Sequence, residues 1–72
     1  MTARTEAFGA NLRIIRKAKG FSQDQLALAA GIDRSYMGRV ERGEVNITLE
    51  KIYVLAQTLG VSPRDLIPET DL

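Results

Sequence analysis

The chain has 72 residues, of which 44% are hydrophobic and 26% are charged, and its formal net charge is +1. This length fits one small domain, and the hydrophobic content excludes a disordered segment. Cysteine and histidine are both absent, which excludes disulfides, thiolate chemistry, the usual zinc sites and the commonest general base.

The distribution of apolar residues disfavours membrane and secreted proteins. No apolar run approaches the roughly 20 residues that span a membrane. The start, MTARTEAFGANLRIIR, lacks the continuous apolar segment of a signal peptide. We therefore expect a cytoplasmic protein with no membrane partner, no metal and no cofactor.

The charges nearly cancel but are unevenly placed. Seven bases and three acids lie between positions 13 and 42, whereas three acids and no base lie from position 65 onward. A basic middle is a mild indication of an anionic partner, although ordinary scatter of solvated charges explains these counts more simply.

The first predicted helix spans residues 6–19. Thr5 is its expected N-cap, and Gly20 can end it in the left-handed conformation. Its apolar face repeats at helical spacing and comprises Phe8, Leu12 and Ile15.

Two short helices follow, over residues 23–30 and 34–42. Ser22 and Gln25 fit a capping box at the start of the first, and Asp33 is the expected cap of the second. The glycines that can end these helices are Gly31 and Gly43.

Two more helices are predicted, over residues 49–59 and 63–67. Thr48 caps the first and Gly60 ends it, and Pro63 suits the first position of the second. The expected apolar face of the longer helix comprises Leu49, Ile52, Ala56 and Leu59.

These elements predict an all-α fold, a compact bundle of five helices over residues 6–67. Residues 1–5 are an N-terminal arm and residues 68–72 a C-terminal tail.

A helical wheel divides residues 34–42 into two faces at about 100° per residue. Met37 and Val40 are expected in the core. Gly38 lies on the other, basic face, where a helical glycine costs about 1 kcal/mol relative to alanine. Such a cost on an exposed face suggests the close approach of another backbone or a bulky ligand. The basic face comprises Arg34, Ser35, Gly38, Arg39 and Arg42, and the apolar face Tyr36, Met37, Val40 and Glu41.

Only Gly-Ile-Asp links the second and third helices, so the two must cross sharply. Ala27 is small enough for a close crossing, and Gly31 supplies the turn. This is the arrangement of a helix-turn-helix, whose second helix enters the DNA major groove.

The segment SQDQLALAAGIDRSYMGRVERG resembles the helix-turn-helix of the phage repressor and Cro-like (Xre-type) family. The resemblance continues through ITLEKIYVLAQTLGVSPRDLI and covers residues 8–67. It implies a lambda-repressor-like fold with the helix-turn-helix in helices two and three. Within the family, the short length and DRSY…ERG…NIT look most like controller proteins of restriction–modification systems.

The resemblance also implies roles for individual residues. Glu41 matches an acid that pairs with an arginine of helix one, here Arg16, as a structural ion pair. Residues at base-reading positions are Arg34, Ser35 and Arg39, and candidates for phosphate contact are Ser22, Gln23, Tyr36, Arg42 and Asn46. For Tyr36, packing in the core remains an equal alternative.

The leading hypothesis is a transcriptional regulator that binds a (pseudo)palindromic operator in double-stranded DNA as a homodimer. The expected dimer surface comprises Val61, Leu66 and Ile67, unless these residues complete the monomer core. No second domain follows, so we expect no small-molecule effector domain and regulation by protein concentration.

An antitoxin or adaptor whose main partner is a protein is the alternative. A steep fall of affinity with salt would favour DNA, because phosphate contacts release counterions. An enzyme is disfavoured, because the nearest acid pair, Glu41 and Glu44, is explained by an ion pair and a solvated turn.

Overall fold

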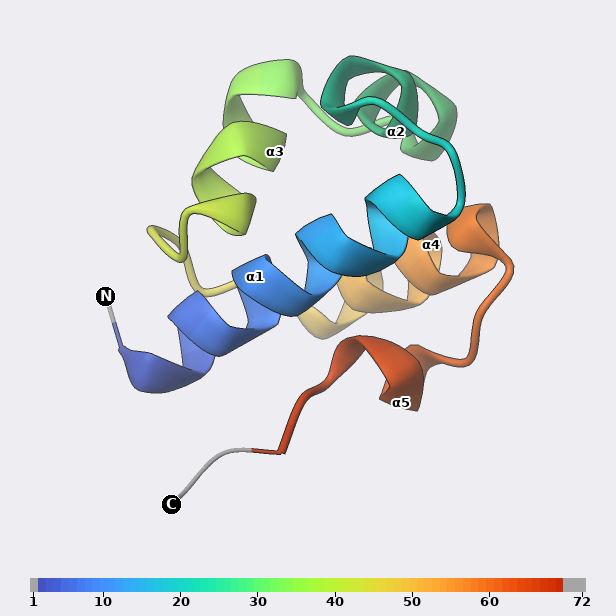
Figure 1. Ribbon diagram of the computed structural model, residues 1–72. Coiled ribbons are helices and arrows are strands. Elements are labelled where there is room, and N and C mark those ends of the chain that lie inside the picture. The colour runs from blue at the N-terminus through green and yellow to red at the C-terminus, as the bar shows by residue number, and fades with distance from the viewer. Residues whose placement is uncertain (1, 70–72) are drawn as a thin grey trace.

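The structure, a computed structural model, describes residues 2–69 and contains five helices and no strand within them (Figure 1). The predicted all-α, five-helix fold is confirmed. In Figure 1, the second and third helices lie above the first and the short fifth helix lies below it. The helices are α1 (Ala3–Ala18), α2 (Gln23–Ala30), α3 (Arg34–Glu41), α4 (Leu49–Leu59) and α5 (Pro63–Leu66).

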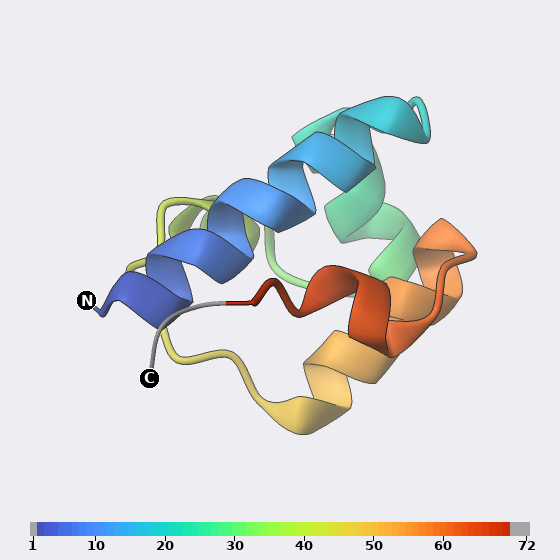
Figure 2. The same ribbon diagram turned by 60° about the horizontal axis from the view of Figure 1, so that its bottom comes forward.

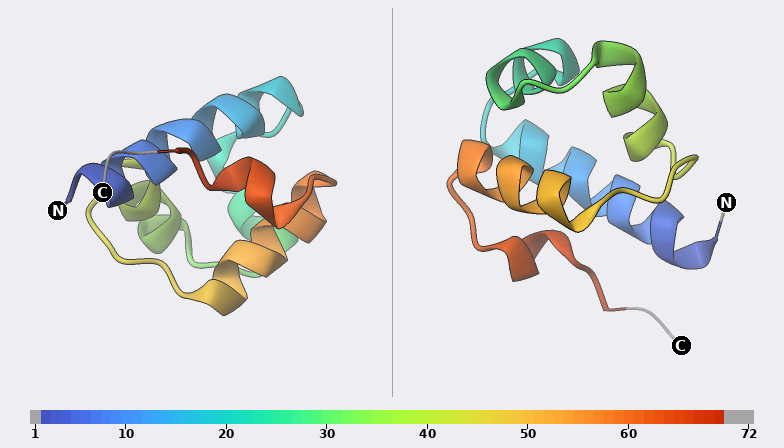
Figure 3. Two further views of the ribbon diagram at one scale, coloured as in Figure 1. Left: turned by 90° about the horizontal axis from the view of Figure 1, so that it is seen from below. Right: turned by 180° about the vertical axis from the view of Figure 1, so that it is seen from behind.

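The short helix α5 packs against both of the longest helices, α1 and α4. Figure 2 shows it between α1 and α4, and both views in Figure 3 show it beside α4. The side-chain amide of Asn11 on α1 donates to the carbonyls of Asp65 and Leu66, both at 3.0 Å. These two bonds attach the end of α5 to the middle of α1.

The start of α1 differs from the prediction. The helix begins at Ala3, with Thr2 and not Thr5 as its N-cap, so the expected arm over residues 1–5 is wrong for residues 3–5. The Thr5 amide donates to Thr2 Oγ1 at 3.1 Å, and the Thr2 amide donates back to Thr5 Oγ1 at 3.0 Å. Thr5 Oγ1 also donates to the carbonyl of Gly43 at 3.0 Å, a tertiary contact that the local sequence does not reveal.

The other predicted caps are confirmed. Ser22 and Gln25 form the reciprocal capping box of α2, the Asp33 carboxylate accepts from the Tyr36 amide at 3.0 Å, and Thr48 Oγ1 accepts from the Lys51 amide at 3.2 Å. The residues after the first four helices that have positive φ are Gly20, Gly31, Gly43 and Gly60.

The core contains the apolar face of every helix, and both Met37 and Val40 lie in it as predicted. One expected member is wrong: Leu49 is 68% exposed, because it is the first residue of α4 and lies beyond the edge of the core. The buried apolar residues are Phe8, Leu12, Leu26, Ala27, Met37, Val40, Leu55, Ala56, Leu59 and Leu66.

The link between α2 and α3 positions the helix-turn-helix. Gly31 has φ +68°, and the Ile32 amide donates to the Ala27 carbonyl at 2.9 Å, so the turn closes on the last turn of α2. Ala27 is fully buried, and α2 packs directly against α3. The small buried residue and the three-residue link together allow the close contact between α2 and α3.

Candidate nucleic-acid interface

The outer face of α3 borders a shallow polar depression of about 350 Å³. The three predicted base-reading residues, Arg34, Ser35 and Arg39, are exposed and lie together along it. Arg34 lies 3.7 Å from the Asp24 carboxylate (Nε to Oδ1), and both side chains remain mostly exposed. The other residues that line this depression are Gln23, Asp24, Gly38 and Arg42.

A buried ion pair supports this surface from behind. Arg16 Nε donates to Glu41 Oε2 at 2.6 Å, and its Nη2 donates to Oε1 at 3.0 Å. The remaining nitrogen, Nη1, donates to the Phe21 carbonyl at 3.0 Å. The pair implied by the family resemblance therefore fixes the end of α3 against α1, and bidentate geometry adds specificity to the contact.

Gln23 adds a third donor to the Glu41 carboxylate. Its Nε2 donates to Glu41 Oε1 at 3.0 Å, so the first residue of α2 is attached to the last residue of α3. No buried side-chain nitrogen or oxygen in residues 2–69 is without a partner. No local sequence signal predicts this contact, because 18 positions separate the two residues.

Gly38 is buried, which corrects the expectation that it lies on an exposed face without packing. A Cβ at this position would lie 3.1 Å from Arg42 Nη1 and 3.4 Å from Gln23 Oε1. The glycine thus provides room for two polar side chains that cross the outer face of α3. Its cost in helix stability has a reason within the chain.

Arg42 forms an ion pair with Glu44, a residue that the sequence interpretation assigned only to a solvated turn. Arg42 Nε lies 2.7 Å from Glu44 Oε2, and Nη2 donates to Oε1 at 3.3 Å. The hydrogen bond from Arg42 lowers the pKa of Glu44, and the same bond raises the pKa of Arg42. Both groups are solvent-exposed and charged at neutral pH.

The remaining phosphate candidates lie at different distances from this depression. Ser22 is exposed at the start of α2, next to Gln23. Tyr36 is half-buried and packs against the core, with Lys51 Nζ 5.4 Å from its ring centroid. Asn46 is exposed but lines another part of the surface, so the structure does not group it with the α3 residues.

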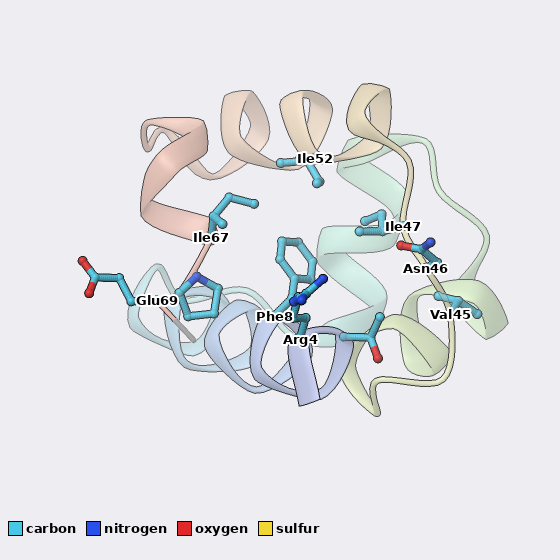
Figure 4. Close-up of a pocket in the computed structure, with 10 residues that line it drawn as sticks. Arg4, Phe8, Val45, Asn46, Ile47, Ile52, Ile67 and Glu69 are labelled. Atoms are coloured by element: carbon cyan, nitrogen blue, oxygen red, sulfur yellow. The ribbon is translucent and has the colours of Figure 1, made fainter. Parts of the chain in front are cut away.

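That other surface is an apolar groove of about 430 Å³ between α1, α4 and the two irregular segments that follow α3 and α5. In Figure 4, Phe8 lies between Ile67 on one side and Ile47 on the other, with Ile52 opposite. We call it the apolar groove; its lining comprises Arg4, Thr5, Phe8, Val45, Asn46, Ile47, Ile52, Ile67, Pro68 and Glu69.

The groove changes the predicted dimer surface. Leu66 is fully buried in the monomer, so its assignment to a dimer surface is wrong. Val61 is partly buried and packs against the core, whereas Ile67 is 50% exposed and lines the groove. Because α5 has four residues, it is too short for a helical repeat to show which residues in and beside it are buried and which are exposed.

Residues 2–69 contain neither a cluster of metal ligands nor a membrane-spanning helix. Within residues 2–69, no group of three acidic side chains is placed to bind a metal ion. None of the helices in this part of the chain has the length and apolar character needed to cross a membrane.

Comparison with known proteins identifies relatives over nearly the whole chain. Residues 12–66 match the family described as Helix-turn-helix. Control protein C.SmaI of Serratia marcescens is 39% identical over 67 residues, covering 93% of this chain and 80% of its own. Control protein C.BamHI of Bacillus amyloliquefaciens is 38% identical over 66 residues, covering 90% and 82%.

A solved structure shows the same similarity in three dimensions. The crystal structure of the restriction-modification controller protein C.AhdI from Aeromonas hydrophila matches with a TM-score of 0.89 and 48% sequence identity. The match covers 92% of this chain and 100% of that one.

Proposed function

Because this chain belongs to the helix-turn-helix family, we propose that it is a transcriptional regulator that reads a DNA operator with α3 in the major groove. The observation that supports this most directly is the exposed face of α3. Arg34, Ser35 and Arg39 project from it into one polar depression, while Met37 and Val40 hold the opposite face in the core. A rigid helix with exposed arginines fits base recognition, since arginine can bind guanine O6 and N7 with two hydrogen bonds.

The surroundings of α3 suit the DNA backbone. The N-terminus of α2 carries unpaired amide groups that favour an anion, and Ser22 and Gln23 lie there. Arg42 lies at the other end of α3, in the same depression. We propose that Ser22, Gln23 and Arg42 contact phosphates, with the Tyr36 hydroxyl and Asn46 as peripheral contacts.

We further propose that two copies associate through the apolar groove. Ile67 of one copy would enter the groove beside Phe8 and Ile52 of the other. Arg4 and Glu69 lie at the rim of the same groove, so a two-fold axis can place each against its opposite charge on the second copy. Exchange between monomer and dimer would then make occupancy of a (pseudo)palindromic operator depend on protein concentration.

Selection of binding sites from a random duplex pool, followed by affinity measurements on the selected sequence, tests the DNA proposal. Arg34→Ala and Arg39→Ala are each expected to reduce discrimination by about 1–3 kcal/mol at one base position. Gln23→Ala should weaken binding on every sequence alike. Arg64→Ala is the matched control, because Arg64 is an exposed arginine on α5, away from α3.

Failure to select any sequence, or variants at Arg34 and Arg39 that discriminate as well as the parent, would disprove this assignment.

Equilibrium sedimentation tests the dimer. Ile67→Arg should give monomers at concentrations where the parent dimerises, with unchanged helicity. Leu28→Arg is the control, because Leu28 is 84% exposed but lies on α2, outside the groove. A parent that stays monomeric while it fills a palindromic operator would disprove the dimer proposal without affecting the DNA proposal.

A further inference from the structure

We propose that Glu44 limits the sequence-independent affinity of this surface for DNA, because its carboxylate occupies the guanidinium edge of Arg42 that would otherwise bind a phosphate. This inference rests on the proposed DNA-binding function. It assigns to a residue in the turn after α3 a role in setting how strongly the backbone is held.

The contact geometry supports competition between carboxylate and phosphate. Glu44 binds Arg42 through Nε and Nη2, at 2.7 and 3.3 Å. The same paired donors form the fork with which arginine binds a phosphate through two oxygens. A phosphate must therefore displace the carboxylate or approach it against its negative charge.

Several contacts hold this ion pair in place. Gly43, the single intervening residue, has φ +75°, and the Glu44 amide donates to the Arg39 carbonyl at 2.9 Å. On the other side, the Arg42 guanidinium lies over Gly38, with Nη1 3.1 Å from the position of an added Cβ. The backbone of the turn and the missing side chain at 38 thus bring the two charged groups together.

The pair is placed where competition would affect binding. Arg42 lines the depression that also contains Arg34 and Arg39, and its side chain is 59% exposed. Since the pair is exposed, its stability is modest, so a phosphate can break it. Glu44 would reduce the phosphate contribution on all sequences without changing which base is preferred.

The experiment compares Glu44→Gln with Glu50→Gln, each in the parent and in the Arg42→Ala background. Both changes remove one negative charge. Glu50 is the control because it is an exposed acid in the first turn of α4 that forms no ion pair within the described part of the chain. Affinity for a random-sequence duplex and for the selected operator is measured by fluorescence anisotropy over a range of salt concentrations.

We expect Glu44→Gln to raise affinity by about two- to fivefold on both duplexes. Its slope of log affinity against log salt should steepen by about 0.9, because one more phosphate is neutralised. Glu50→Gln should have a smaller effect and leave the slope unchanged. In the Arg42→Ala background, the two variants should be indistinguishable.

Three other results would contradict the inference, and they differ in what they mean for the proposed function. If the parent binds DNA and Glu44→Gln matches Glu50→Gln in affinity and slope, or lowers affinity, the inference is wrong and the proposed function stands. An effect of Glu44→Gln that persists without Arg42 also overturns it, since the charge would then act independently of the pair. If none of these proteins binds either duplex, the proposed function fails, and the inference fails with it.

Discussion

The two surfaces of this small chain are built in opposite ways. The α3 surface presents arginines and a serine from a helix whose cap, last residue and inner face are all held by hydrogen bonds or packing. The apolar groove presents isoleucines, a valine and a proline, and much of its lining comes from irregular segments at 45–47 and 67–69. In Figure 1, α3 and α5 lie on opposite sides of α1.

Under the proposed function, this difference corresponds to two kinds of recognition. A polar surface that reads base edges needs side chains fixed to well within an ångström, which a short helix held at both ends provides. An apolar surface gains free energy from the area it buries, and this depends less on the angle of each group. We therefore expect the α3 surface to be sensitive to small structural changes and the groove to tolerate them.

The largest expected effect breaks the support of the α3 surface. Glu41→Ala removes the acceptor of Arg16 and Gln23 and leaves a buried guanidinium without its partner. The free energy of unfolding should fall by about 3–5 kcal/mol, as measured by urea denaturation.

Glu50→Ala, at an exposed position, is the control for this change. A loss below about 1 kcal/mol for Glu41→Ala, comparable with exposed pairs, would mean that α3 is held by its apolar face alone.

A smaller effect should follow from separating α1 and α3. A Cβ added at Gly9 would clash with the Val40 carbonyl oxygen and would lie 2.6 Å from that of Glu41, both backbone atoms. Gly9→Ala should therefore destabilise by about 1–3 kcal/mol, although alanine favours helix. Thermal unfolding measures this.

Ala10→Leu is the matched control for Gly9→Ala, because Ala10 is exposed on the same helix. Equal stability of Gly9→Ala and the parent would show that α1 can shift away from α3 at no cost.

The smallest effect concerns two N-caps of the same kind, one beside the α3 surface and one on α4, which borders the apolar groove. Ser22→Ala and Thr48→Ala should each reduce stability by about 1 kcal/mol, through α2 and α4 respectively. Only Ser22→Ala should also weaken DNA binding under conditions where both variants are fully folded. Equal affinities of the two variants would mean that the N-terminus of α2 does not affect binding.

Much of the fold follows from local signals. Ser22, Asp33 and Thr48 were identifiable as caps from their residue type and position, and Met37 and Val40 as core from helical spacing. The prediction of Thr5 as the N-cap of α1 is wrong because Thr2 and Thr5, three positions apart, can each begin a helix. The bond from Thr5 to the Gly43 carbonyl, which the local sequence does not show, accompanies the start at Thr2.

The arrangement around α3 was less accessible. The wheel identified the outward face, and the structure exposes Arg34, Ser35 and Arg39 there. A helical wheel of α3 cannot reveal that Gln23 and Arg42 cover Gly38. Gln23 belongs to another helix, and the wheel does not show the path of the Arg42 side chain. The glycine at position 38, within a short helix, is the sequence signal of this arrangement. The structure shows that a side chain there would meet Arg42 and Gln23 of the same chain.

The exposure of Arg34, Ser35 and Arg39 has a consequence for how this chain can diverge. None of the three contributes to the core, and only Arg34 has an ion-pair partner in residues 2–69, at 3.7 Å. Replacing them should therefore leave the fold unchanged, as is usual for surface substitutions. Under the proposed function, three substitutions on this scaffold would therefore change the operator that is bound while the five helices stay as they are.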